Sequence, residues 1–254
     1  MRLLAIINQK GGSGKTTTCV NVAAGLAEKK RSVLVIDLDS QGSTTAWLGV
    51  SKDTQGIYPV FAENVPLSNV IVSTEYKEID CIPASSWLVG LDKRLAQEVG
   101  AETILRHQLE QLQGKEYDYV IIDCPPTLGV LTVNALCAVH EVIVPVEARF
   151  MALSGLVQLL ETIDLIKKRL NQTLRIAGIV PCRVDARTKH SQEVVEELKN
   201  NFKGMVYKTA IRENIRLSEA SSFAQPIMMY DSTSKGAYDY RALTKEIIKQ
   251  ENAS

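Results

Sequence analysis

The sequence lacks the features that define several large classes of protein. Its five cysteines are scattered and none forms a C-x-x-C pair, which argues against zinc or a cysteine-held cluster and favours reduced thiols in the cytoplasm. No apolar run reaches the roughly 18 residues that a membrane span needs. The apolar run at residues 3–7 is short and has no cleavage site of small residues, so it favours a buried strand over a signal peptide. There is no internal repeat and no low-complexity segment.

Length and charge set further bounds. With 254 residues, 45% of them hydrophobic, the chain can bury a sizeable core, and we expect residues 1–254 to form one domain. The net charge is zero, but residues 1–166 carry 13 Lys and Arg against 19 Asp and Glu, whereas residues 167–254 carry 16 against 10. Either this is an ordinary solvated surface, or the C-terminal third presents a basic face that attracts phosphates.

Apolar runs rich in Val and Ile alternate with helical patterns along the chain. Several runs are apolar throughout, as expected for strands covered on both faces. The predicted fold class is therefore α/β: one mostly parallel, twisted sheet flanked by helices on both faces. Ligands of such sheets bind at the carboxyl ends of the strands. The predicted strands are residues 3–7, 33–37, 79–83, 119–123, 141–145, 176–181 and, more weakly, 205–209.

A glycine-rich segment follows the first predicted strand and opens a predicted helix. Its three glycines allow a tight turn that points several backbone N–H groups at one phosphate, and the helix N-terminus adds partial positive charge. Lys15 can reach the β- and γ-phosphates of a nucleotide, and the Thr16 hydroxyl can take one position on Mg²⁺. The residues predicted to bind the nucleotide are Lys10, Gly11, Gly12, Ser13, Gly14, Lys15, Thr16 and Thr17.

Two predicted strands end in carboxylates. Strand 33–37 ends in Asp37 and is followed closely by Asp39, and strand 119–123 ends in Asp123. Carboxylates at strand ends beside a phosphate loop are well placed to hold Mg²⁺ and its waters. An exposed turn would explain each acid alone, but it explains the set poorly.

The phosphate loop departs from the ordinary pattern, because Gln9 stands where a glycine is required and Lys10 precedes the glycine pair. In this it resembles the deviant Walker A box of the ParA/MinD/nitrogenase-iron-protein class. Residues 37–43 and 123–129 resemble the ParA/Soj motifs D-x-D-P-Q-G and D-C-P-P-S-L-G, with serine at position 40 in place of proline. Residues 185–188 and 214–220 resemble the chromosomal branch of that family, and the similarity runs over nearly the whole chain.

The resemblance implies a P-loop ATPase that uses ATP and Mg²⁺ and closes into a homodimer around two nucleotides. Lys10 would reach the partner's nucleotide, Asp39 would orient the attacking water, and Asp123 would contact Mg²⁺ through water. Residues 37–43 and 123–129 would act as nucleotide-sensing switches. The implied catalytic set is Lys10, Lys15, Asp39 and Asp123, and the implied metal set is Thr16, Asp39 and Asp123.

The resemblance also implies binding of DNA without sequence preference once ATP has dimerised the protein. Arg187 and Arg216 would grip the phosphates, so binding should weaken steeply with salt. A surface salt bridge is the alternative for each arginine. Lys189, Lys208 and Lys235 would widen the patch.

A further expectation concerns the base and ribose of the nucleotide. By the same resemblance, the segment from Arg212 to Asn214 and the side chain of Glu219 should lie near the adenosine. Arg212 replaces a proline that is common at this position.

The predicted function is an ATP-driven switch that partitions chromosome or plasmid DNA with a ParB-like partner, in the cytoplasm and on the nucleoid. The same switch could position a protein cargo instead. A metabolic or redox enzyme on this fold remains a separate hypothesis, although no cysteine stands in a cluster motif. A MinD-like membrane regulator is disfavoured, because residues 243–251 lack a basic amphipathic face with bulky apolar anchors. We expect no N-terminal helix-turn-helix extension and therefore no sequence-specific operator binding.

Overall fold

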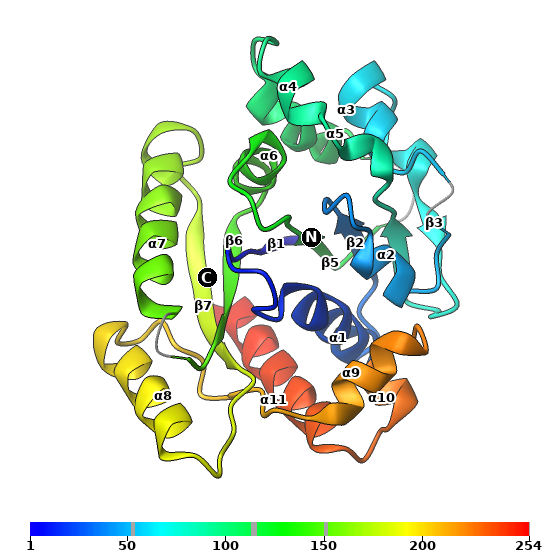
Figure 1. Ribbon diagram of the computed structural model, residues 1–254. Coiled ribbons are helices and arrows are strands. Elements are labelled where there is room, and N and C mark those ends of the chain that lie inside the picture. Colours follow the sequence, from blue (N-terminus) through cyan, green and yellow to red (C-terminus); the bar gives the residue numbers. More distant parts are fainter. Residues whose placement is uncertain (52–53, 113–115, 150–151, 254) are drawn as a thin grey trace.

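A computed structural model describes residues 1–51, 54–112, 116–149 and 152–253. Its centre is a seven-stranded sheet with the strand order β3-β4-β2-β5-β1-β6-β7 (Figure 1). Every neighbouring pair is parallel except β3 and β4, which confirms the predicted α/β class. The strands are β1 (Arg2–Ile6), β2 (Val33–Asp37), β3 (Val72–Ser73), β4 (Ile79–Ile82), β5 (Tyr119–Asp123), β6 (Glu141–Glu147) and β7 (Arg175–Cys182).

Helices cover both faces of this sheet (Figure 1). One face carries α1, α2, α10 and α11, and the other carries α3 to α8. The α-helices are α1 (Lys15–Glu28), α2 (Ser43–Trp47), α3 (Tyr58–Glu63), α4 (Leu91–Leu95), α5 (Ile104–Glu110), α6 (Val130–Ala138), α7 (Ala152–Arg169), α8 (Lys189–Asn201), α9 (Ile215–Ser222), α10 (Ile227–Tyr230) and α11 (Lys235–Lys249).

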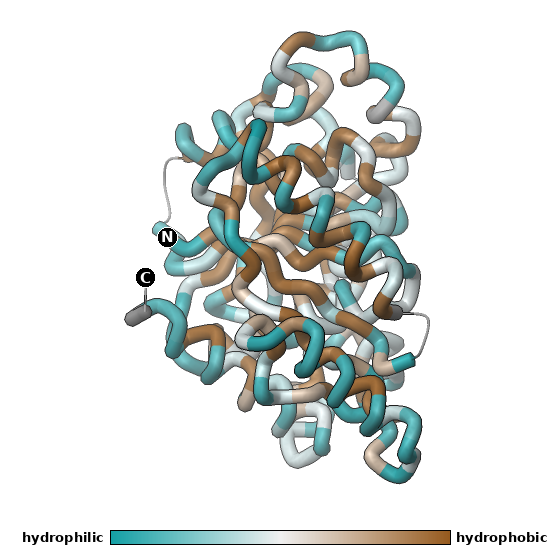
Figure 2. Tube along the Cα trace, turned by 90° about the vertical axis from the view of Figure 1, so that its left-hand side faces the viewer, coloured by the Kyte–Doolittle hydropathy of each residue, from teal (hydrophilic) through white to brown (hydrophobic). Residues whose placement is uncertain are grey.

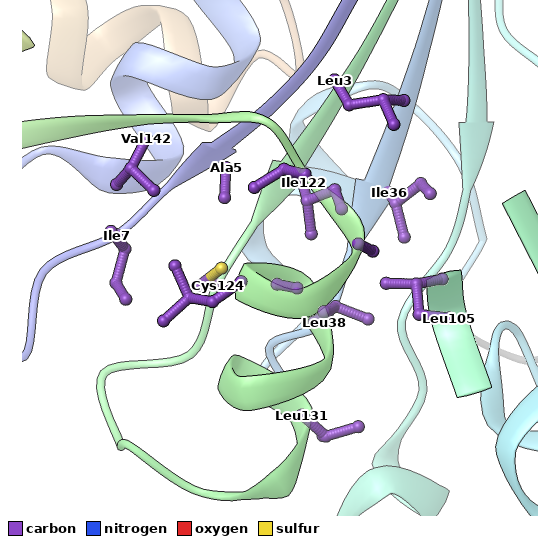
Figure 3. Packing of buried hydrophobic residues seen from close by; sticks show 14 of the residues in the cluster. Leu3, Ala5, Ile7, Ile36, Leu38, Leu105, Ile122, Cys124, Leu131 and Val142 are labelled. Atoms are coloured by element: carbon purple, nitrogen blue, oxygen red, sulfur yellow. The ribbon is translucent and has the colours of Figure 1, made fainter. Parts of the chain in front are cut away.

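The central strands are apolar because both of their faces are buried. In β1, Leu4 and Ile6 pack toward α1 and α11, whereas Leu3 and Ala5 pack toward α5 and α6. Figure 3 shows residues of the second of these layers, from the strands and from helices α5 (Leu105) and α6 (Leu131). The hydropathy colouring shows the same division, with brown strands inside and teal segments around them (Figure 2). Full burial of one such side chain contributes about 1.5–3 kcal/mol.

Two differences from the predicted strands matter for the site. β6 and β7 extend to Glu147 and Cys182, so both residues lie at the carboxyl edge of the sheet. The predicted strand at 205–209 is wrong: it makes one isolated bridge, between Ile179 and Val206. The N–H groups of residues 208 and 209 donate to the carboxylate of Glu246 instead of to a strand.

Close packing at β7 gives a test of the fold. A Cβ atom on Gly178 would lie 2.4 Å from the Cε2 atom of Tyr207, whose ring is buried. Gly178→Ala should therefore lower the free energy of unfolding by about 1–3 kcal/mol through overpacking. Urea denaturation measures this value.

Gly155 of α7 provides the matched control, because a Cβ there would meet no heavy atom within 4 Å. Gly155→Ala should leave the stability unchanged or raise it by up to about 1 kcal/mol through helix propensity. Equal stabilities of the two variants would contradict the packing described for Gly178 and Tyr207.

Candidate nucleotide site

The loop between β1 and α1 has the backbone of an anion-binding turn. Gly12 and Gly14 have φ values of 74° and 96°, in the left-handed region that side chains with a Cβ atom rarely adopt. Gly14 is the N-cap of α1 and supplies no capping side chain, so the first N–H groups of the helix are available to a ligand. The hydroxyl of Ser13 is buried without a hydrogen-bond partner. These features fit a bound phosphate chain.

A cavity of about 760 Å³ opens above this loop, a volume typical of small-molecule sites. It lies at the carboxyl ends of β1, β2, β5 and β7, where a parallel sheet binds its ligands. Three parts of the chain form its walls: the loop with the start of α1, the two predicted switch segments, and the region from Cys182 to α9. The lining residues are Gly11, Gly12, Gly14, Lys15, Thr16, Thr17, Asp39, Gln41, Ser43, Trp47, Pro126, Cys182, Arg183, Ile211, Glu213, Asn214, Ile215, Leu217, Ser218 and Ser221.

The predicted acids meet at this edge of the sheet. The parallel register of β2 and β5 pairs Asp37 with Asp123, and both carboxylates are buried. Asp123 Oδ2 accepts a hydrogen bond from Thr16 Oγ1 at 2.8 Å, while its Oδ1 atom is buried without a partner. Asp39 is partly exposed and lines the cavity. Asp37 is fully buried and does not line the cavity, and its carboxylate accepts two hydrogen bonds from Thr45.

Burial shifts the charges of this group. Desolvation and the charge of Asp123 raise the pKa of Asp37 to about 7. Desolvation raises the pKa of Asp123 to about 6, against hydrogen bonds from two threonines and the charge of Lys15. Burial also lowers the pKa of Lys15, whose exposed fraction is only 8%. Each of these groups would gain from an ion or phosphate of opposite charge in the cavity.

Two threonines that sequence reasoning missed connect the acids to α2. Thr44 Oγ1 donates to Asp123 Oδ2 at 2.7 Å, and both the hydroxyl and the backbone N–H of Thr45 donate to Asp37 Oδ2. Their only signal in the sequence is that they directly follow the first predicted switch. Because they are hydrogen-bonded to the acids, α2 is held against the ends of β2 and β5.

Lys10 lies in the phosphate loop, but its side chain does not line the cavity. Its Nζ atom forms an ion pair with Glu147 Oε2 at 2.9 Å, and both residues border a separate hollow with Asn8 and Gln158. Glu147 is 5% exposed at its side chain, and Arg149 and Arg183 also approach its Oε1 atom. The amine of Lys10 therefore points away from the phosphates that its own loop would bind.

Of the residues expected near the adenosine, only some lie at the cavity. Asn214 lines the cavity and caps α9. Arg212 does not line it, because its guanidinium is bound to the carboxylate of Asp239, with Nη2 at 2.6 Å from Oδ1. Glu219 also faces away, toward Arg216 and Tyr230. The cavity wall in this region is formed instead by Ile211, Glu213, Ile215, Leu217, Ser218 and Ser221.

The five residues predicted to bind DNA are all exposed. Arg187 precedes α8 and Lys189 begins it, Arg216 lies in the first turn of α9, and Lys235 begins α11; Figure 1 shows these three helices along the lower side of the molecule. Lys208 lies beside Glu246.

Both arginines are paired with acids of their own chain. Arg187 is bound to Asp185 at 2.9 Å, and Arg216 to Glu219 at 2.8 Å. The predicted alternative of a surface salt bridge therefore holds for each arginine in the free chain.

The oxygen atoms of the site show whether a divalent cation would fit. The Thr16 hydroxyl, the partnerless Oδ1 atom of Asp123 and the carboxylate of Asp39 are hard oxygen ligands of the kind that Mg²⁺ prefers. Among the described residues, no group of three His, Cys, Asp or Glu side chains could hold a metal ion by itself. The residues thus fit an ion that takes part of its coordination from a phosphate chain.

A parallel sheet with a glycine-rich loop before α1 and acids at the ends of two neighbouring strands defines a P-loop nucleotide-binding protein. Residues 1–176 match a family model described as "AAA domain". The chain is 44% identical over 248 residues to the sporulation initiation inhibitor protein Soj of Bacillus subtilis, covering 97% of this chain and 98% of Soj. It is 42% identical over 252 residues to the chromosome partitioning protein ParA of Myxococcus xanthus, covering 98% and 89%. The chain belongs to the ParA/Soj family of partitioning ATPases.

The similarity extends to solved structures. A structure of cobyrinic acid a,c-diamide synthase from Mycobacterium smegmatis, with a bound ATP analogue and magnesium, superposes with a TM-score of 0.87 at 35% identity. The match covers 99% of this chain and 96% of that one. Among the described residues, no helix combines the length and apolar character needed to cross a membrane.

The buried carboxylate of Asp123 gives a prediction for the protein without ion and nucleotide. Because its pKa rises from an unfolded value of about 3.9 to about 6 in the folded chain, its charged form destabilises the fold. The penalty is absent below about pH 4 and complete above about pH 6. Asp123→Asn retains an oxygen for both threonine hydroxyls, so it should raise the free energy of unfolding at pH 8 by about 1–3 kcal/mol.

Urea denaturation at pH 4 and pH 8 measures this effect, and the two proteins should be equally stable at pH 4. A lower stability of Asp123→Asn at pH 8 would contradict the electrostatics described here.

Proposed function

We propose that this chain is an ATP-controlled, dimerising switch that binds DNA without sequence preference and partitions DNA with a ParB-like partner. One observation carries the proposal: Lys15, Thr16 and Asp39 line one cavity and Asp123 is hydrogen-bonded to Thr16 behind its wall, while the side chain of Lys10, from the same loop, is paired with Glu147 outside the cavity. The first four residues suit nucleotide hydrolysis within one subunit. An outward-facing lysine suits a contact with a second subunit.

Each residue then has a defined task at the nucleotide. The N–H groups of the loop and Lys15 would bind the phosphates, and Thr16 and Asp123 would hold Mg²⁺. Bound Mg²⁺ would polarise the phosphate oxygens. Asp39 lies at the cavity wall, where its carboxylate can orient the attacking water by accepting a hydrogen bond from it. Asn214 and its neighbours on α9 border the region left for the adenosine.

The position of Lys10 supports the proposed dimerisation. Its side chain is 41% exposed and its amine is held by a nearly buried carboxylate, so it can exchange Glu147 for a partner's phosphates. Arg149 and Arg183 remain near Glu147 to balance its charge. We further propose that residues 1–254 act as one domain, and that the active dimer gathers on nucleoid DNA in the cytoplasm. A protein cargo moved by the same switch stays an alternative.

The contribution of Lys10 can be tested in an Asp39→Ala background, where hydrolysis should stop and the ATP dimer should persist. Adding Lys10→Ala should leave ATP bound but yield single subunits in sedimentation velocity with ATP and Mg²⁺. The reason is that only the interaction across the interface is removed.

Lys15→Ala is the control, since it should lose ATP binding altogether. If the Asp39→Ala protein sediments as a single subunit with saturating ATP and Mg²⁺, the dimer proposal is wrong. If Asp39→Ala/Lys10→Ala still dimerises, Lys10 does not act across the interface.

The DNA interaction can be tested at Arg216. Arg216→Ala should spare ATP-driven dimerisation and weaken binding to duplex DNA of any sequence. The slope of log affinity against log salt should fall by about one for each phosphate that the variant no longer binds.

Lys93→Ala removes the same charge from α4, on the opposite side of the molecule (Figure 1), and should leave DNA binding unchanged. Equal DNA affinities of Arg216→Ala and the parent protein would remove Arg216 from the DNA face.

A second candidate function is favoured by one observation: the chain is 35% identical to the cobyrinic acid a,c-diamide synthase of Mycobacterium smegmatis. On that hypothesis the cavity would bind a small carboxylic acid beside ATP. ATP turnover measured with and without cobyrinic acid, and with and without duplex DNA, separates the two functions. We expect DNA to raise turnover and the acid to leave it unchanged; a requirement for the acid would establish the enzyme instead.

A further inference from the structure

We propose that Glu219 and Asp231 hold Arg216 in ion pairs in the nucleotide-free chain, and that nucleotide in the cavity releases Arg216 for DNA by displacing α9. The inference rests on the proposed role of Arg216 in DNA binding. It adds the acids that oppose this role and the helix that connects it to the nucleotide.

The ion pairs of Arg216 engage two edges of its guanidinium. Nη1 donates to Glu219 Oε2 at 2.8 Å, and Nε lies 3.6 Å from Asp231 Oδ2. Tyr230 also donates its hydroxyl to Glu219 Oε2, at 3.1 Å. A DNA phosphate needs the same N–H groups that these carboxylates occupy. The acids therefore compete with DNA for one side chain.

The ion pairs also join two helices. Glu219 belongs to α9, whereas Tyr230 ends α10 and Asp231 follows it. The ring of Phe223, just after α9, stacks on that of Tyr230 with a centroid distance of 5.3 Å. A displacement of α9 relative to α10 therefore changes the distance between Arg216 and Asp231.

α9 carries the cavity on one side and Arg216 on the other. With 100° between successive helical residues, four of the five cavity-lining residues of this segment, Asn214, Leu217, Ser218 and Ser221, fall on one face, and Ile215 lies at its edge. Arg216 and Glu219 fall on the opposite face. A nucleotide that contacts the first face acts on the same short helix that presents Arg216.

A hydrogen bond connects α9 to the acids of the site. Trp47 of α2 lines the cavity and donates its Nε1–H to the carbonyl of Gln225, between α9 and α10, at 2.7 Å. The same α2 is bonded to Asp123 through Thr44. A hydrogen bond thus connects α2, at one wall of the cavity, to the turn that follows α9, at the other wall, and a nucleotide between them can strain or relieve it.

Glu219→Gln tests the proposal, because it removes the competing charge and leaves the nucleotide cavity unchanged. Binding to a random-sequence duplex should become several-fold tighter without nucleotide, with a salt slope steeper by about one phosphate contact. The ratio between the affinities with ATP and without nucleotide should shrink. Asp231→Asn should act in the same direction, and Arg216→Ala/Glu219→Gln should abolish the gain.

Glu196→Gln on α8 is the matched control, since it changes the net charge equally at an exposed position. Equal affinities for Glu219→Gln and Glu196→Gln would overturn the proposal. If Arg216→Ala alone does not weaken DNA binding, the proposed DNA face fails instead.

Trp47→Phe at saturating ATP should bring DNA affinity toward the nucleotide-free value, and an unchanged affinity would overturn the link through α2.

Discussion

The structure depends on two carboxylates buried side by side at the edge of a parallel sheet. The register of β2 and β5 places Asp37 beside Asp123, where desolvation raises the pKa of both carboxylates and the charge of Asp123 raises that of Asp37 further. Hydrogen bonds from Thr16, Thr44 and Thr45 offset only part of this penalty. A charged pair in this position destabilises the chain without ligands. Its presence beside the phosphate loop is therefore explained by a bound cation and phosphates rather than by packing.

The same hydrogen bonds connect ligand binding to the position of α2. Asp123 Oδ2 accepts from Thr16 of the phosphate loop and from Thr44 of α2, so a ligand that takes over either partner changes how α2 is held. α2 in turn reaches the α9–α10 turn through Trp47 and Gln225. A ligand shifts a conformational equilibrium only when it contacts the two states differently. Here the groups that would contact a nucleotide are also the groups that hold the cavity walls together.

Sequence reasoning predicted the sheet and the loop well because both depend on local pattern. The continuous apolar runs and the glycine spacing were sufficient for β2, β5 and the turn at Gly14. It failed where a residue's environment is set by a distant partner. Arg212 is turned away from the cavity by Asp239, 27 residues later, and residues 205–209 satisfy part of their backbone through Glu246 instead of a strand. Neither partner can be identified from spacing alone.

The excess of basic residues in the C-terminal third was also misleading, because the partners of these residues cannot be read from the sequence. Counted along the chain it suggests free positive charge, yet Arg187, Arg212, Arg216 and Arg241 each form an ion pair with an acid of the same chain. An arginine already bonded to a carboxylate must break that bond before it can bind a phosphate. Its net contribution to DNA binding is therefore the difference between the free energies of the phosphate contact and of the ion pair. If the chain binds DNA as proposed, the strength of binding depends less on the number of arginines than on the release of those arginines from their acids. A conformational change at α9 can alter that without changing any charge.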